Sequence, residues 1–177
     1  MSSVIGQLSP GVWEIDTTRS KVGFTVRHMM LSKVKGTFDV FEGAITAKSG
    51  EVPSVRAEVS VDSLNTNNSL RDAGTKAADF FGAATYPVGV FVSTGVTADT
   101  GQRYWLEGDL TLRGVTKPVR MALKFNGVKG DRASFDATVG LNRKDFGVDM
   151  AASAVTGGAV VGDRVDLVLH VEAVLQG

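Results

Sequence analysis

Residues 119–141 read Val119-Arg-Met-Ala-Leu-Lys-Phe-Asn-Gly-Val-Lys-Gly-Asp-Arg-Ala-Ser-Phe-Asp-Ala-Thr-Val-Gly-Leu141, and this stretch decides the fold class. A period of two in apolar side chains predicts β-strands that have one apolar and one polar face. Two turn signals, Asn126-Gly127 and Gly130-Asp131, interrupt the alternation and predict an antiparallel hairpin. The alternating apolar positions are Val119, Met121, Leu123 and Phe125, followed by Phe135, Ala137, Val139 and Leu141.

The same alternation recurs along the rest of the chain. A run at 35–48 is apolar but is interrupted by Glu42-Gly43, which predicts a tight turn or a bulge there. Thr100-Gly101 and Arg113-Gly114 are further turn signals between alternating runs. The other alternating runs lie at 21–28, 55–61, 88–92, 104–112 and 165–173.

Helical patterning is scarce. Only the segment around 67–82 carries apolar residues at helical spacing, and it predicts one short helical insertion. About eight strands joined mainly by hairpin-sized connections favour an all-β fold with one antiparallel sheet, either closed as a barrel or stacked as a sandwich. With no linker or internal repeat, residues 1–177 form a single predicted domain.

Composition excludes several function classes. Lys plus Arg and Asp plus Glu both number 19, so no basic surplus is present to bind nucleic acid. The chain has no Cys and 2 His, which excludes thiolate sites and a three-histidine metal site. We expect no cofactor and no metal. We also expect no membrane span, because no apolar run approaches the roughly 20 residues that a membrane helix needs. The N-terminal residues lack the pattern of a signal peptide, and we therefore expect a soluble, cytoplasmic protein.

A closed sheet of about eight strands has an interior that side chains either fill or leave open for one small ligand. The residues expected to point inward mix small side chains, such as Ala57 and Ala137, with large ones, such as Phe24 and Phe135. Composition leaves both possibilities open.

Ordered segments across almost the whole chain resemble the YceI-like, polyisoprenoid-binding family. The resemblance runs from Trp13 to about Val174, and one departure is Gly74-Thr75, where the family usually has His-Leu. The segments are Trp13–Met29, Gly36–Phe38, Phe41–Gly43, Asp62–Asn67, Arg71-Asp72, Asp79–Phe81, Tyr86-Pro87, Gly108–Val119, Asn142–Gly147 and Gly162–Val165.

The resemblance implies an extended, lipocalin-like barrel that encloses a long apolar channel. In that family the channel takes an isoprenoid tail, such as that of a quinone or a polyprenyl phosphate, and no catalytic activity is established for the family as a class. The resemblance also associates the family with stress responses. The expected partner is therefore a long-chain isoprenoid or other apolar lipid, and an apolar patch at an edge or mouth would allow a homodimer.

Strand parity supplies the candidate ligand-binding residues. We expect Trp13 to plug the base of the barrel, since large aromatic side chains dominate core burial. Phe146 would line the entrance. The expected apolar wall comprises Phe24, Val26, Phe38, Val59, Phe80, Phe81, Val90, Leu110, Leu112, Met121, Leu123, Phe135 and Leu141.

A polar end for the ligand would draw on His28, Arg71, Asp72 or Arg143. Each also has a structural interpretation: His28 as a hydrogen-bonded core group, Arg71-Asp72 as charges at a helix start, and Arg143 as a partner of backbone carbonyls or Asp145. His170 falls on the opposite face of the last strand and is expected at the surface.

Three function classes follow from these observations. The first is a carrier that sequesters an isoprenoid lipid and has no catalytic residues. The second is a small barrel enzyme, an isomerase or cyclase acting on a bound lipid, with His28 as its acid–base group. The third is an interaction module with a solid core.

Overall fold

The computed structural model describes residues 8–28, 32–67, 86–146 and 161–176. All of their regular structure is β-strand, apart from two short 3-10 turns, η2 (Val61–Ser63) and η3 (Arg143–Phe146). The predicted helical insertion at 67–82 lies outside the described residues except for Asn67. The strands are β1 (Gly11–Ile15), β2 (Lys21–His28), β3 (Ser32–Phe38), β4 (Phe41–Ala47), β5 (Ser54–Ser60), β6 (Leu64–Asn65), β7 (Val88–Ala98), β8 (Arg103–Leu112), β9 (Val115–Lys129), β10 (Arg132–Asn142) and β11 (Val161–Leu175).

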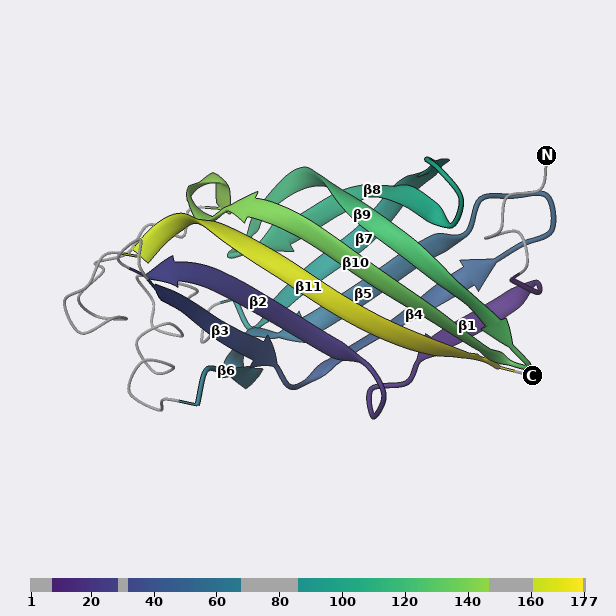
Figure 1. Cartoon of the computed structure of the whole chain (residues 1–177), viewed down its shortest axis with the longest axis horizontal. Coiled ribbons are helices and arrows are strands. Elements are labelled where there is room, and N and C mark those ends of the chain that lie inside the picture. Colours follow the sequence, from purple (N-terminus) through teal and green to yellow (C-terminus); the bar gives the residue numbers. More distant parts are fainter. Residues whose placement is uncertain (1–7, 29–31, 68–85, 147–160, 177) are drawn as a thin grey trace.

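The sheet closes into a barrel, as the family resemblance implies, and not into the sandwich that the strand pattern alone also allowed. Every pairing is antiparallel, and the neighbours run β1-β4-β5-β7-β8-β9-β10-β11, with β11 pairing back to β1. The ring therefore has eight strands. Figure 1 shows long strands that run obliquely along the elongated barrel. An eight-stranded barrel is the size at which the interior is either filled or able to hold one small ligand.

Three of the eight ring positions are long strands that are interrupted part-way. β1 and β2 are two halves of one such strand, because β1 pairs with the C-terminal part of β11 and β2 pairs with its N-terminal part. β3 and β4 follow the same path, pairing with β2 and β1 respectively. β5 and β6 are the third interrupted pair, and β6 pairs with β3. The barrel is thus a simple meander in which neighbours in sequence are neighbours in space.

Two predicted turns lie elsewhere. The interruption between β3 and β4 falls at Asp39–Val40, where Val40 is 62% exposed, and Gly43 lies within β4. The site of Gly43 has no room for a side chain, because a Cβ there would meet Ile15 Cδ1 at 2.7 Å and Arg56 O at 2.9 Å. Likewise β9 continues through Asn126-Gly127, where φ of +111° at Gly127 accompanies a register shift, and the chain turns only after Lys129.

The two ends of the barrel differ. At one end, which we call the base, short turns at 48–53, 99–102 and 130–131 connect the strands. At the other end, the mouth, β2 passes to β3, β8 passes to β9 through Arg113-Gly114, and β10 ends at Asn142. Figure 1 shows the start of β1 and the end of β11 near the base.

Candidate functional site

The inner face of the barrel is identified by strand register and burial together. In β10 every odd residue from Ala133 to Leu141 is buried, and in β8 Tyr104, Leu106, Gly108 and Leu110 are buried. Directly paired residues share a face, so the register extends this inner face around the ring. Of the predicted wall residues, those on the inner face are Phe24, Val26, Phe38, Val59, Leu110, Leu112, Met121, Leu123, Phe135 and Leu141.

The base is closed by large side chains. Trp13 and Phe125 are fully buried, and the Phe125 and Phe135 rings stack with centroids 5.2 Å apart. The Trp13 indole Nε1 donates a hydrogen bond to the Ser9 carbonyl at 3.0 Å, which satisfies its one polar atom. Trp13 therefore seals the base, as its position in the sequence predicts.

The inner face is more open toward β2, β3 and β5. Phe24 and Phe38, whose ring centroids are 5.4 Å apart, form a second buried cluster with Val22 and Leu64. The inner residues around it keep part of their surface accessible. The described side chains therefore do not completely cover this part of the inner face. These partly buried inner residues are Val26, Phe41, Val59, Val165, Leu167 and Leu169.

One predicted wall residue lies on the wrong face. Val90 pairs with Thr111, whereas its neighbour Phe91 pairs with the buried Leu110. Val90 therefore points outward with Val88 and Val92, which are 40% and 41% exposed. The prediction for Val90 is wrong. Both faces of this strand carry apolar residues, Val88, Val90 and Val92 on one and Phe91 on the other, so hydrophobicity alone does not decide which face points inward.

The predicted polar end is only partly visible. His28 ends β2, where its backbone pairs with Val161 and Ser32, and Arg143 begins η3; the side chains of both lie outside what the structure describes. Phe146 is 2% exposed and packs into the main core cluster through η3. Arg71, Asp72, Phe80 and Phe81 lie outside the described residues.

Lys117 is not among the predicted site residues, although it belongs to the inner row, the set of residues whose strand parity points them into the barrel. In β9, Val115, Val119 and Met121 are inner residues, and Lys117 shares their parity and pairs with the buried Leu110. Its side chain is nonetheless exposed, because it lies near the mouth. Extending the alternation of Val119, Met121 and Leu123 backward by two residues would have found it.

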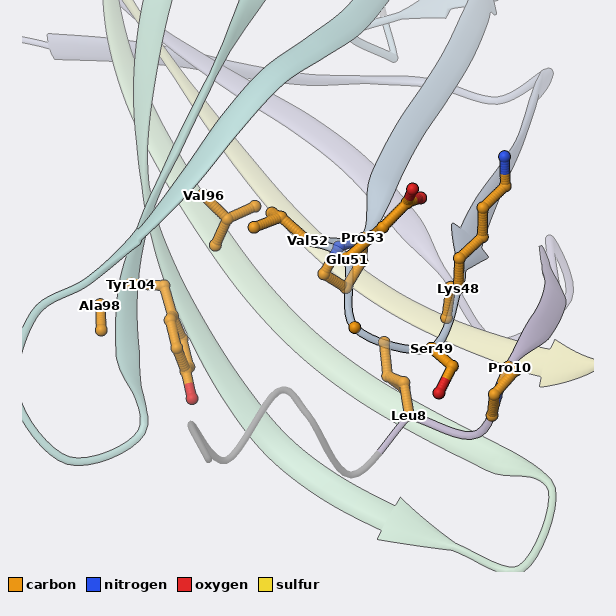
Figure 2. A pocket seen from close by; sticks show the side chains of 12 residues that line it. Leu8, Pro10, Lys48, Ser49, Glu51, Val52, Pro53, Val96, Ala98 and Tyr104 are labelled. Atoms are coloured by element: carbon orange, nitrogen blue, oxygen red, sulfur yellow. The ribbon is translucent and has the colours of Figure 1, made fainter. Parts of the chain in front are cut away.

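A separate pocket of about 430 Å³ opens at the base. Figure 2 shows Val96, Ala98 and Tyr104 on one side of it, with Leu8 and Pro10 of the N-terminal segment near the turn that joins β4 to β5. It lies at the opposite end of the barrel from Lys117. Its full lining is Leu8, Pro10, Ala47, Lys48, Ser49, Gly50, Glu51, Val52, Pro53, Val96, Ala98 and Tyr104.

The outer face carries a polar network across β10 and β11. The His170 ring nitrogens lie 2.8 Å from Asp136 Oδ1 and 3.3 Å from Glu172 Oε2. These carboxylates, with Asp136 the stronger influence, raise the pKa of His170 above its usual 6.5. His170 is on the outer face as predicted, 42% exposed, and the geometry gives it a structural role between two strands.

Asp16 joins the same network. The Thr18 hydroxyl and Arg132 donate hydrogen bonds to its carboxylate, at 2.5 Å and 2.9 Å, and lower the pKa of Asp16 from 3.8 to about 2.

Within the part of the chain that the structure describes, no three His, Asp or Glu side chains cluster so as to hold a metal ion. The described residues also include no helix long and apolar enough to cross a membrane.

Comparison with known proteins agrees with this geometry. The model of the YceI-like domain family matches residues 13–173, almost the entire barrel. The chain belongs to the YceI-like family. Protein YceI of Escherichia coli O157:H7 is 36% identical over 162 residues, covering 88% of this chain and 81% of the relative. A UPF0312 protein of Vibrio cholerae serotype O1 is 35% identical over 169 residues, covering 90% and 85%.

Solved structures share the YceI-like fold. Burkholderia cenocepacia BcnA superposes with a TM-score of 0.80 at 23% identity, covering 89% of this chain and 98% of that protein. A polyisoprenoid binding domain from Saccharophagus degradans, implicated in plant cell wall breakdown, superposes with a TM-score of 0.78 at 16% identity, covering 93% and 98%. These two likenesses establish the barrel architecture.

Proposed function

We propose that this YceI-like protein is a carrier that sequesters the tail of a long-chain isoprenoid lipid inside its barrel. The observation that carries the proposal is the largely apolar inner face, sealed at the base by Trp13 and only partly buried toward Val26, Val59 and Leu167. The structurally similar domain from Saccharophagus degradans is itself named for polyisoprenoid binding. A quinone and a polyprenyl phosphate both have a tail of this kind.

The energetics favour a tail inside the barrel. Each buried methylene gains about 0.8 kcal/mol, so a prenyl chain of several units gains enough to offset its lost freedom of motion. Partly buried inner residues such as Val59 and Val165 would lose their remaining contact with water when the tail enters. Specificity for the tail would depend on the depth of the interior between the mouth and Trp13.

We assign binding without chemical change to this interior. Among inner-row side chains that the structure describes, the polar ones are Ser93, Tyr104 and Lys117. The Ser93 hydroxyl already accepts a hydrogen bond from the Val55 N–H at 2.7 Å, which fixes it in a structural role. A lipid recovered with unchanged mass and unchanged chromatographic retention after prolonged incubation would support this assignment, because an isomerase or cyclase can form a product of the same mass that elutes differently. A new product, isomers included, that is lost in the His28→Gln variant would contradict it.

The direct test is an organic extract of the purified protein, analysed by mass spectrometry, together with uptake of an added polyprenol. We expect a long-chain isoprenoid in the extract, or saturable uptake by lipid-free protein. Val59→Phe and Val90→Phe form a matched pair, because these valines are on adjacent strands but opposite faces. Uptake should fall in Val59→Phe and persist in Val90→Phe. Absence of both extracted lipid and uptake would overturn the proposal.

A further inference from the structure

We propose that Lys117 is the cationic contact for the ligand's head group, and that the protein therefore prefers an anionic, phosphate-bearing isoprenoid to a neutral one. This inference rests on the proposed carrier function and specifies which class of lipid the same interior takes. The inference is based on the position of one charged side chain on the inner face. Among the inner-row side chains that the structure describes, Lys117 is the only charged one.

The register places Lys117 at the edge of the apolar wall. It pairs with Leu110, which is 7% exposed, and Leu110 in turn pairs with the buried Phe91 on β7. Two residues separate Lys117 from Arg113-Gly114, the turn at the mouth. A lysine beside such a wall lays its aliphatic stem on apolar neighbours and keeps its ammonium in water. A bound lipid would lie in the same orientation, with its tail on the apolar wall and its head group at the ammonium near the mouth.

The ammonium of Lys117 is available for a ligand. Within the described part of the chain, its side chain forms no hydrogen bond or ion pair. The nearest acidic residues along the paired strand, Glu107 and Asp109, lie on the outer face. The other cation of this part of β9, Arg120, also lies outside, with its guanidinium 4.1 Å from the Trp105 ring centroid.

Beside Lys117, β9 has a paired strand on one side only among the described residues. The ladder between β9 and β10 ends at Ala122 and Thr138, so the first residues of β9 pair only with β8. Pro118 fits such an edge, since a proline cannot donate a ladder hydrogen bond. A head group bound at Lys117 would therefore compete with no described β9–β10 backbone pairing at this position.

The chemistry of lysine favours phosphate over a quinone carbonyl. A compact ammonium binds an anionic oxygen through charge-assisted hydrogen bonds, which are roughly twice as strong as neutral ones. A partly exposed bond of this kind corresponds to about tenfold in affinity. A neutral alcohol or quinone head group would gain little from the same lysine.

The test compares geranylgeranyl monophosphate with geranylgeraniol, which share one tail, by isothermal titration of the full chain at low and high salt. We expect the phosphate to bind about tenfold more tightly at low salt, with a smaller advantage at high salt. Lys117→Gln should abolish that advantage and leave geranylgeraniol binding unchanged. Lys124→Gln is the matched control, because Lys124 is exposed on the outer face of the same strand.

The outcomes separate this inference from the carrier proposal. Equal binding of the two probes, or a phosphate preference that survives in Lys117→Gln, would overturn the role of Lys117 and leave carriage intact. Failure of the native protein to bind either probe would overturn the carrier proposal itself. Circular dichroism and the unfolding midpoint check that both variants are folded, and this exposed site tolerates a polar replacement.

Discussion

Arg132 Nη1 lies 2.9 Å from Asp16 Oδ2, and this ion pair ties the first residue of β10 to the turn that separates β1 from β2. Glu172 on β11 is a second partner of Arg132, at 3.5 Å, and its backbone carbonyl accepts the Asp16 N–H at 2.8 Å. Three ring positions thus meet at one arginine. The interruption of the first long strand is held in place by these contacts, beside the closure of the barrel.

Asp16→Asn should lower stability at neutral pH and weaken the acid dependence of unfolding. The folded-state pKa of Asp16 is about 2, below its usual 3.8, so its contribution is fully present above 3.8 and is lost as pH falls through 2. Urea unfolding midpoints across that range measure it. The gap between native protein and variant should close toward pH 2. Glu51→Gln, in an exposed base turn, is the control, and a gap independent of pH would contradict the account.

His170 should stabilise the fold in its protonated form. Its pKa is raised above 6.5 by Asp136 and Glu172, so the contribution is fully present below 6.5 and is lost as pH rises through the folded-state value. In the native protein the unfolding midpoint should fall over that interval, and in His170→Gln it should change less. The His170 ring proton resonance, followed by NMR, should titrate above 6.5. Titration at or below 6.5 would contradict the hydrogen-bonded arrangement.

Gly108→Ala should destabilise the barrel by about 1–3 kcal/mol, because the added methyl group overpacks the inner face. A Cβ at Gly108 would lie 2.4 Å from Phe91 Cζ and 2.6 Å from the Val92 carbonyl oxygen. Gly95→Ala is the matched control on the adjacent strand, since a Cβ there meets nothing within 4 Å. Chemical unfolding of both variants makes the comparison. Equal effects would show that Gly108 is not needed for Phe91 to pack.

Trp13→Ala should cost about 3–5 kcal/mol, the range for removing a large buried aromatic side chain. Trp13 is fully buried at the base, and its indole is hydrogen-bonded to Ser9. Trp105→Ala is the control, because that ring lies on the outer face and loses mainly its contact with Arg120, worth about 0.5–1 kcal/mol. Similar losses in the two variants would contradict a base sealed by Trp13.

Sequence periodicity predicted the strands and their antiparallel order because one face of each strand packs inside and the other meets water. It failed where both faces are apolar. Along β7 the choice between Val90 and Phe91 depends on whether the Phe91 ring fits over Gly108, and that contact joins two strands. The position of the break at Asp39–Val40 is likewise set by pairing with β6, a contact distant in sequence.

The candidate site followed the same pattern. Inner residues such as Phe24, Phe38 and Met121 could be predicted from parity alone. Parity with Val119 and Met121 also places Lys117 on the inner face, but a search for apolar wall residues passes over it, because an inner position at an open mouth accepts a charge that the core would exclude. Its register with Leu110 confirms this place on the inner face.

The central claim is that an isoprenoid tail lies along the inner face of the barrel. It is tested most directly by photolabelling with an isoprenoid that carries a diazirine in its tail, followed by mapping of the modified residues by mass spectrometry. We predict labels on inner-row residues such as Phe24, Val59 and Leu167, and protection by excess unlabelled polyprenol. Labels confined to outer residues such as Val88 and Val92, or no protected labelling, would contradict the account.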